Sequence, residues 1–350
     1  MPYSSLLNPF TAHLLNLDLT DRLEQYVACA NVALMHYPIA DVHPVFLQHN
    51  AGVTYRVDRS DGTPCYLLKI HEPIGTSQRA PLHQITARLQ WLATVHCQST
   101  FLVQAPVLNN AGHFLTWVTH PMLPTPFVCT LQTWVAGEPV RGDLTVQQIE
   151  HIGMMIATLH NIAHQIRDIT YDCLPRLEPA DVSQWLQGFQ SVVASGLLTE
   201  ADVDILAATT AKLHRVLIRT REQPDVWMPV HGDLNHANLL FDDEVVHPID
   251  FDGLHLAPYW MDLGTMLYHI HYQGTSAHRA LMKGYTIVRT IPDRDRAHID
   301  AAVTLSAMSN LAFQITIAEQ RASPILHRNI RQLIDEFCSA LLDETPLITV

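Results

Sequence analysis

The chain has 350 residues, of which 48% are hydrophobic and 16% charged, a balance typical of a globular protein and not of a disordered one. Because one ordinary hydrophobic core rarely organises this many residues, we expect two lobes. The formal net charge of -13 argues against a nucleic-acid surface, which would carry a basic patch. The charge fits a neutral or cationic small ligand, and an acidic surface that only keeps the protein soluble explains it as well.

The sequence contains neither a cysteine- or histidine-based metal motif nor a membrane segment. Its six cysteines are scattered without a CxxC pair, which predicts reduced thiols and no disulfide framework. His160 and His164 stand four residues apart on a predicted helix, but without an HExxH motif we interpret them as structural. No basic N-terminal segment precedes an apolar run, and no apolar stretch reaches bilayer length. We therefore expect a cytoplasmic protein with no membrane and no nucleic-acid partner.

Residues 1–136 alternate between short strands and single helices, which predicts a β-rich lobe preceded by a helical extension over residues 1–40. Two apolar runs flank the turn residues 60–63, a pattern typical of a β-hairpin. The expected elements in chain order are a helix over 18–36, strands over 45–48, 53–57 and 65–70, a helix over 81–96, and further strands within 101–135.

Gly137 and Pro139 interrupt the strand pattern and predict the boundary between the two lobes. Residues 137–350 are mostly helical in pattern; Ile149, Ile152 and Ile156, for example, share one helix face. A single strand-rich stretch interrupts these helices. The resulting fold class is α+β, with a small β-rich lobe that contains one main helix and a larger helical lobe.

The strand-rich interruption reads HGDLNHANLLFDDEVVHPIDFDG, residues 231–253. Residues 239–241 and 245–249 predict two short strands, and the three acids 242–244 between them are interpreted as a solvated turn. Asn238 precedes the first strand and Asp250 ends the second, so the folded hairpin would bring them together. An amide oxygen beside a carboxylate is the kind of ligand that Mg²⁺ prefers.

Asp233 lies five residues before Asn238, where a carboxylate could accept the proton of a substrate hydroxyl. The alternative is that Asp233 caps a turn and Asp250 an adjoining helix. One such acid would be unremarkable in that role, whereas the joint spacing is much rarer by chance. The spacing therefore favours a catalytic site over capped turns.

The HxDxxxxN pattern, followed by paired strands and IDFDG, resembles the aminoglycoside phosphotransferase and choline kinase-like family over about residues 20–340. The resemblance implies a two-lobed, protein-kinase-like fold. It also implies transfer of the γ-phosphate of ATP, with Mg²⁺, to a hydroxyl of a small molecule. It leaves the acceptor unspecified, and a protein side chain is one alternative. The oligomeric state is not specified either.

The resemblance also implies roles for individual residues of the acidic stretch. Asp233 would be the catalytic base, and Asn238 and Asp250 would hold the metal. His231 would support the loop as a buried scaffold residue, and Asp262 in MDLG would steady the loop backbone. Asp252 could reach substrate or metal, or could only cap the turn at Gly253.

In the N-terminal lobe, the resemblance implies a nucleotide site. Alternation in YLLKI places Leu67 and Lys69 on one strand face, where Lys69 would hold the α- and β-phosphates and Leu67 would cover adenine. Gly52 stands where related kinases have a glycine-rich loop. The segment LQTWVAGE resembles the hinge that binds adenine through backbone groups, here those of Thr133, Trp134 and Val135.

One departure from the kinase pattern is Arg88, which occupies the position of the helix glutamate that pairs with the strand lysine. Residues 73–137 contain no Asp or Glu, so Gln84 would have to substitute, or Asp250 and the phosphates would hold Lys69. Two alternatives to an active kinase therefore stay open. One is a kinase-like protein that binds nucleotide or a partner with little or no catalysis, and the other is a metal-dependent phosphohydrolase.

Overall fold

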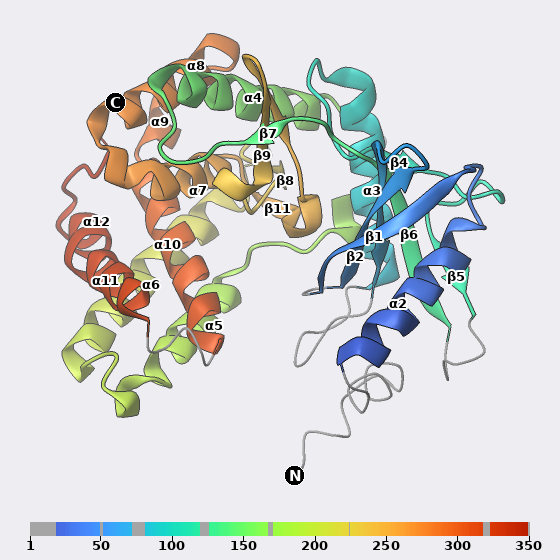
Figure 1. Ribbon diagram of the computed structural model, residues 1–350. Helices are drawn as coiled ribbons and strands as arrows, with labels where there is room; N and C mark the ends of the chain where they lie inside the picture. Colours follow the sequence, from blue (N-terminus) through green and yellow to red (C-terminus); the bar gives the residue numbers. More distant parts are fainter. Residues whose placement is uncertain are drawn as a thin grey trace. The chain divides into compact units, whose positions relative to one another are not determined.

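The computed structural model describes residues 19–49, 52–71, 81–119, 126–166, 171–223, 225–317 and 323–348. The chain divides into two compact units, unit 1 (Met1–Ala136) and unit 2 (Gly137–Val350) (Figure 1). The part of the expected helical extension before residue 19 lies outside the described residues, as do the turn residues Asn50 and Ala51.

Unit 1 is built on one antiparallel sheet of six strands. The strand order is β1-β2-β3-β6-β4, and β5 also pairs with β6. The β2–β3 hairpin is confirmed, and Gly62 in its turn has φ +83°, a backbone conformation that glycine adopts without strain. The elements of unit 1 are α2 (Leu19–Leu34), β1 (Val42–His49), β2 (Val53–Arg59), β3 (Pro64–Ile70), α3 (Leu82–Gln98), β4 (Pro106–Val107), β5 (Thr116–Val118) and β6 (Phe127–Thr133).

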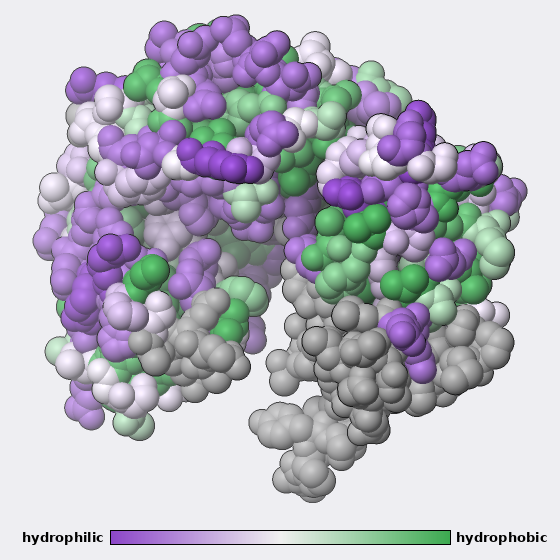
Figure 2. All heavy atoms as spheres, viewed as in Figure 1, coloured by the Kyte–Doolittle hydropathy of each residue, from purple (hydrophilic) through white to green (hydrophobic). Residues whose placement is uncertain are grey.

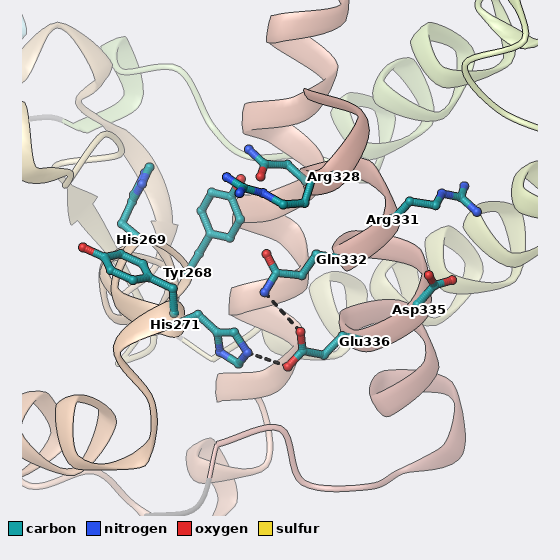
Figure 3. Close-up of a pocket in the computed structure, with 10 residues that line it drawn as sticks. Tyr268, His269, His271, Arg328, Arg331, Gln332, Asp335 and Glu336 are labelled. Atoms are coloured by element: carbon teal, nitrogen blue, oxygen red, sulfur yellow. Dashed lines mark hydrogen bonds and ion pairs between the residues drawn. The ribbon is translucent and has the colours of Figure 1, made fainter. Parts of the chain in front are cut away.

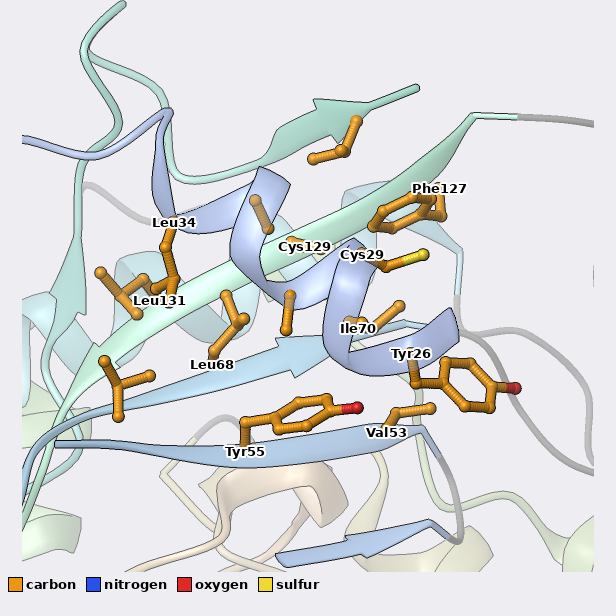
Figure 4. Close-up of a cluster of buried hydrophobic side chains, with 14 of the residues drawn as sticks. Tyr26, Cys29, Leu34, Val53, Tyr55, Leu68, Ile70, Phe127, Cys129 and Leu131 are labelled. Carbon is orange, nitrogen blue, oxygen red and sulfur yellow. The ribbon is translucent and has the colours of Figure 1, made fainter. Parts of the chain in front are cut away.

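The core of unit 1 lies between α2 and one face of this sheet (Figure 4). Tyr55 of β2 and Leu68 and Ile70 of β3 are completely buried there, packed with side chains from α2. Burial of one such aliphatic side chain stabilises the fold by about 1.5–3 kcal/mol. Because neighbouring residues of a strand point to opposite faces, this burial places Leu67 and Lys69 on the other face of β3.

Unit 2 is mainly helical, as expected from its sequence (Figure 1). Its main helices are α4 (Val146–Gln165), α5 (Pro179–Gln190), α6 (Glu200–Thr220), α7 (Trp260–Ile270), α8 (Thr275–Val288), α9 (Asp293–Arg296), α10 (Ile299–Thr316), α11 (Pro324–Gln332), the π-helix η8 (Leu333–Cys338) and α12 (Ser339–Asp343). Short 3₁₀ turns are η2 (Tyr171–Cys173), η3 (Val193–Ser195), η4 (His236–Asn238), η5 (Phe251–Gly253) and η6 (His271–Gln273).

Unit 2 contains more strand than the sequence indicated. The predicted hairpin is present as β9 (Leu239–Asp242) and β10 (Val245–Pro248), and β9 also pairs with β7 (Glu138–Pro139). A second ladder joins β8 (Trp227–Val230) to β11 (His255–Pro258). The predicted single interruption is therefore present between α6 and α7, but it runs from β8 to β11 and is longer than expected. The additional strands have only two to four residues each, too few for an alternating pattern to stand out.

Close helix contacts in unit 2 depend on glycine. A Cβ atom on Gly284 of α8 would overlap the carbonyl oxygen of Glu150 in α4, and one on Gly153 of α4 would overlap that of Leu281. A Cβ atom on Gly264 of α7 would likewise overlap atoms of Ala302 in α10. Because the obstructing atoms are mostly backbone, a larger residue could be accommodated only if the helices moved apart.

The described surface is mixed in character. Hydrophilic residues cover most of unit 2 in Figure 2, whereas apolar residues are visible over the strands of unit 1. Among the described helices, none combines the length and apolar character needed to cross a bilayer. All six cysteines lie in the described residues and carry free thiols.

The α4–α8 contact makes a prediction for stability. We expect Gly284→Ala to lower the free energy of unfolding by about 2 kcal/mol or more, because the new methyl group forces two helix backbones apart. Gly188→Ala in α5 is the matched control, since nothing lies within 4 Å of its Cβ position. The control should be neutral or stabilising by about 0.5–1 kcal/mol. Urea unfolding of both variants checks this, and equal effects would contradict the assigned contact.

Candidate active site

The loop His231–Asn238 follows β8, and its backbone is held by one buried carboxylate. Asp262, in the first turn of α7, accepts hydrogen bonds from the backbone N–H of His231 (2.9 Å, Oδ2) and of Gly232 (3.0 Å, Oδ1). The Asp262 side chain is 1% exposed. A buried carboxylate needs such donors to offset its lost hydration, and the N-terminal end of a helix adds favourable electrostatics.

A buried hydrogen-bonded chain extends from Asp262 into α4 and α8. His160 Nε2 lies 3.2 Å from Asp262 Oδ2, and His160 Nδ1 lies 2.9 Å from the Tyr285 hydroxyl. Burial lowers the pKa of His160, so the imidazole is neutral. Burial also raises the pKa of Asp262, but the hydrogen bonds that the carboxylate accepts from His160 and from the loop backbone outweigh it and hold that pKa below its ordinary value. The geometry then has Tyr285 donating to His160, and His160 donating to an ionised Asp262.

The His231 ring fastens the loop to the end of the β9–β10 hairpin. Its Nε2 lies 3.0 Å from the carbonyl oxygen of Ile249, and its Nδ1 accepts from the backbone N–H of Asp233 at 3.3 Å. The ring also packs on Phe251, with 4.3 Å between the ring centroids. Gly232 beside it has φ +79°, and a Cβ there would overlap the Gly253 carbonyl oxygen. Glycine is therefore required both by the backbone conformation and by the lack of space.

The carboxylate of Asp233 is oriented by two asparagine amides. Asn238 Nδ2 donates to Asp233 Oδ2 (2.9 Å) and to the Asp233 carbonyl oxygen (2.8 Å). Asn235 Nδ2 donates to Asp233 Oδ1 (2.9 Å), while its own Oδ1 caps η4 through the Ala237 N–H. Partial burial raises the pKa of Asp233, against the lowering effect of these amides. A fixed carboxylate with a raised pKa is suited to accept a proton.

Asn238 and Asp250 flank the open end of the β9–β10 hairpin. The backbone N–H of Ile249 donates to the Asn238 carbonyl oxygen at 3.0 Å, so Asp250 is the next residue along. Asp250 has φ +60° and ψ 63°, the left-handed conformation that few residues other than glycine adopt. Such backbone conformations cluster at functional sites, where the surrounding structure maintains them.

These two residues fit a cation that shares its coordination with a ligand. The Asn238 amide nitrogen is engaged with Asp233, which leaves Oδ1 as the donor atom for a metal beside the Asp250 carboxylate. In the described residues, no group of three or more His, Cys, Asp or Glu side chains could enclose a metal ion. Mg²⁺ ordinarily binds one or two protein oxygens and takes its other ligands from water and phosphate.

In unit 1, Gly52 and Lys69 lie near the C-terminal end of β3, whereas Thr133 of the predicted hinge pairs with Tyr66 near its start. Lys69 of β3 lies opposite Thr54 of β2 and Thr130 of β6 in the ladder. A Cβ on Gly52 would meet the carbonyl oxygen of Ile70 at 2.7 Å and the Lys69 side chain at 3.4 Å. Close backbone packing therefore explains the glycine at position 52.

The predicted hinge offers fewer free backbone groups than expected. The N–H of Thr133 donates to the Ala105 carbonyl oxygen (2.8 Å), and that of Trp134 to the Cys65 carbonyl oxygen (3.0 Å). In the part of the chain that the structure describes, the N–H of Val135 donates to no protein group. Arg88 and Gln84 lie one turn apart on α3, both partly buried.

Comparison with known proteins identifies the family. The model of the phosphotransferase enzyme family matches residues 46–299. The chain belongs to this family. No curated protein matches the chain.

Solved structures of family-like kinases share its fold. A microcompartment-associated aminopropanol kinase superposes with a TM-score of 0.73 at 22% identity, covering 92% of this chain and 99% of that one. An amicoumacin kinase in complex with AMP-PNP, Ca²⁺ and Ami gives a TM-score of 0.70 at 19% identity, covering 95% of both chains. Choline kinase from Cryptosporidium parvum Iowa II gives 0.60 at 10% identity, covering 92% and 97%. These findings confirm the protein-kinase-like fold and a phosphotransferase with an alcohol group as acceptor.

The structure adds residues to the site that were not identified as site residues from the sequence. Asn235 holds Asp233, and its position two residues after that acid and directly before a short helix is the signal of an N-cap. His160 was interpreted as structural, which its burial and contacts confirm, but its partner Asp262 lies 102 residues away. Tyr285 had no local signal at all.

The Asp262 contacts predict a stability effect. We expect Asp262→Asn to lower the free energy of unfolding by about 3 kcal/mol, because an amide cannot accept from both backbone N–H groups and His160 as a carboxylate does. Since the folded-state pKa of Asp262 is lowered, its stabilising effect is present above the ordinary carboxyl pKa and is lost as the pH falls through the folded-state value. Urea unfolding at neutral and acidic pH should show the difference from wild type shrinking on acidification.

The matched control is Asp293→Asn, also in the first turn of a helix but fully exposed. It should change the free energy of unfolding by less than about 0.5 kcal/mol. A similar small effect of Asp262→Asn would contradict the role given to the buried carboxylate.

Proposed function

We propose that the protein is an ATP- and Mg²⁺-dependent kinase that transfers the γ-phosphate to a hydroxyl of a small molecule. The observation that carries this is the arrangement at the His231–Asn238 loop. One amide, that of Asn238, orients the Asp233 carboxylate and keeps its oxygen for a cation beside Asp250. The family assignment and the small-molecule kinases that share the fold support the same reaction.

Asp233 would act on the acceptor. Its carboxylate would accept a hydrogen bond from the acceptor hydroxyl, align that oxygen with the γ-phosphorus, and take up the proton as the new P–O bond forms and the bond to the leaving ADP oxygen breaks. Two amides fix its orientation, so little reorganisation is needed at the moment of transfer. The raised pKa of Asp233 favours this proton uptake.

Asn238 Oδ1 and the Asp250 carboxylate would hold the divalent cation, which neutralises phosphate charge when bound. Unit 1 would contribute the nucleotide contacts. Lys69 would pair with the α- and β-phosphates, and Leu67, on the same strand face, would cover the adenine ring. Among the hinge residues, Val135 retains the backbone N–H suited to adenine.

Replacement of Asp233 separates chemistry from nucleotide binding. We expect Asp233→Asn to lower kcat by at least about a hundredfold, because the amide cannot accept the hydroxyl proton. Binding of Mg-ATP should be nearly unchanged. An ATP-consumption assay over pooled alcohols, with thermal-shift titration of Mg-ATP, measures both quantities. Asp243→Asn, in the β9–β10 turn with φ 52°, is the matched control and should retain full activity. If Asp233→Asn turned over at the wild-type rate, Asp233 would not be the catalytic base.

Replacement of Lys69 distinguishes a kinase from a phosphohydrolase. We expect Lys69→Met to weaken ATP binding or raise its KM by about tenfold, since a charge-assisted contact to phosphate is lost. Product analysis is the second readout, because a kinase forms phosphorylated acceptor in step with ADP. Phosphate release without any acceptor, unaffected by Lys69→Met, would favour the phosphohydrolase.

A further inference from the structure

The two ends of α7 have different surroundings. The C-terminal end, with η6, lines a cavity of about 790 Å³ together with α11 and η8 (Figure 3). Both Arg328 and Asp335 line this cavity, so its charge selects neither an anion nor a cation, and about 10 Å of helix separates it from Asp262. The N-terminal end, where Asp262 holds the His231–Asn238 loop, is linked by hydrogen bonds to α4 and through it to α8. The contacts that act on the loop through Asp262 therefore come from α4 and α8.

His160 is the group through which α4 reaches Asp262, and its ring is neutral with a single N–H. Burial lowers the pKa of His160, and the charge of Arg289 acts in the same direction, against the raising effect of Asp262. Asp262 is ionised and can only accept, so this N–H lies at Nε2, 3.2 Å from Asp262 Oδ2. The other ring nitrogen, Nδ1, is then a buried lone pair that requires a hydrogen-bond donor.

The Tyr285 hydroxyl supplies that donor. It lies 2.9 Å from His160 Nδ1, and the Tyr285 side chain is completely buried. Burial raises the pKa of Tyr285 well above its ordinary value, so the hydroxyl keeps its proton and donates. The close contact of α4 with α8 fixes this arrangement, since a Cβ on Gly153 would lie 2.7 Å from the Tyr285 backbone nitrogen. The donors of the chain therefore all point from α8 toward the Asp262 carboxylate.

Without the Tyr285 hydroxyl, His160 has no arrangement that satisfies both ring nitrogens. In the described part of the chain, no other donor lies at hydrogen-bond distance from Nδ1. If the N–H stays at Nε2, Nδ1 is buried without a partner, and if it moves to Nδ1, the Nε2 lone pair faces the Asp262 carboxylate. Rotation of the ring would give up the Asp262 contact. Asp262 would then be less firmly held against the backbone N–H groups of His231 and Gly232.

We propose that Tyr285 is a positioning residue of the phosphotransfer site. Its hydrogen bond orders the His160 imidazole, which holds Asp262. Asp262 in turn holds the backbone of the loop that carries Asp233. Because a displacement of about 1 Å at a reacting group can reduce a rate by about a hundredfold, even a small loosening of this loop lowers kcat. The effect on turnover rests on the proposed kinase function, whereas the effect on the order of the loop does not.

Tyr285→Phe removes the hydroxyl and keeps the ring, and Tyr259→Phe is its matched control. The Tyr259 hydroxyl is also buried, but it donates to Asp295 Oδ2 at 2.9 Å and not to His160. The Tyr259 ring packs on Tyr285, with 6.3 Å between centroids, and on His160, with 5.8 Å. The control therefore loses a buried hydrogen bond in the same cluster. Both variants should lower the free energy of unfolding, so stability alone does not separate a positioning role from a structural one.

Amide hydrogen exchange measures the order of the loop without any substrate. Rates are taken relative to the amide of Leu305, a completely buried residue of α10 that reports global unfolding. On this scale we expect Tyr285→Phe to speed exchange of the Gly232 N–H at least about tenfold, and Tyr259→Phe to leave it unchanged. Equal relative rates in the two variants would overturn the proposal.

A double-mutant cycle tests whether Tyr285 acts through His160. In a His160→Leu background, Tyr285→Phe should have no further effect on the relative exchange rate of Gly232, because the contact it removes is already absent. Additive effects would show that Tyr285 acts by another route and would overturn the assignment.

Turnover of the pooled alcohols in the ATP-consumption assay gives the catalytic readout. We expect Tyr285→Phe to lower kcat at least about threefold with the KM for ATP unchanged, and Tyr259→Phe to retain the wild-type kcat. A wild-type kcat in Tyr285→Phe would overturn the positioning role. If the wild type turned over none of the alcohols, the proposed kinase function would be contradicted, while the exchange rates would still decide whether Tyr285 orders the loop.

Discussion

The Asp262 carboxylate accepts hydrogen bonds from two backbone N–H groups of the His231–Asn238 loop. The rest of unit 2 depends on this interaction. The His231–Asn238 loop has no helix or strand of its own until η4, so its first peptide groups need an external partner. Asp262 supplies that partner from the start of a buried helix and is itself satisfied by His160. The same helix therefore fixes the position of Asp233 at one end and lines the cavity at the other.

Two short ladders hold this loop from both sides. The β8–β11 ladder precedes and follows it in sequence, and the β9–β10 hairpin begins directly after Asn238. The His231 ring connects the loop to the hairpin through the Ile249 carbonyl oxygen. Each ladder is too short to be stable alone, so both depend on the helices that pack around them. A rigid loop between two ladders is what a reaction governed by positioning requires.

The sequence was sufficient for features with a local cause. The β2–β3 hairpin and the β9–β10 hairpin follow from short apolar runs with turn residues between them, and α4 follows from its apolar periodicity. By contrast, β8 and β11 have four residues each and include Pro229 and Pro258, residues that ordinarily argue against a strand. Contacts such as His160 with Asp262 join segments about a hundred residues apart, and no local pattern encodes them.

The same distinction applies within the nucleotide residues of unit 1. Alternation along β3 correctly separates the face of Leu68 from that of Lys69, because burial on one face has a period of two. The hinge could not be resolved in this way. Whether a backbone N–H is free depends on the neighbouring strand ends, and the carbonyl groups of Ala105 and Cys65 occupy those of Thr133 and Trp134.

The hydrogen-bond donors and acceptors around residue 238 explain why it is an asparagine. Asn238 gives its amide N–H groups to Asp233 and so has only its oxygen left for a cation. An aspartate there would bind a cation at least as well, but it would place a second carboxylate against that of Asp233 and raise the pKa of one of them. It would also remove the shorter hydrogen bond to the Asp233 carbonyl oxygen and leave only the one from Asn235 at 3.3 Å. Asparagine is the residue that serves both neighbours at once, which is why the loop needs an amide between two acids.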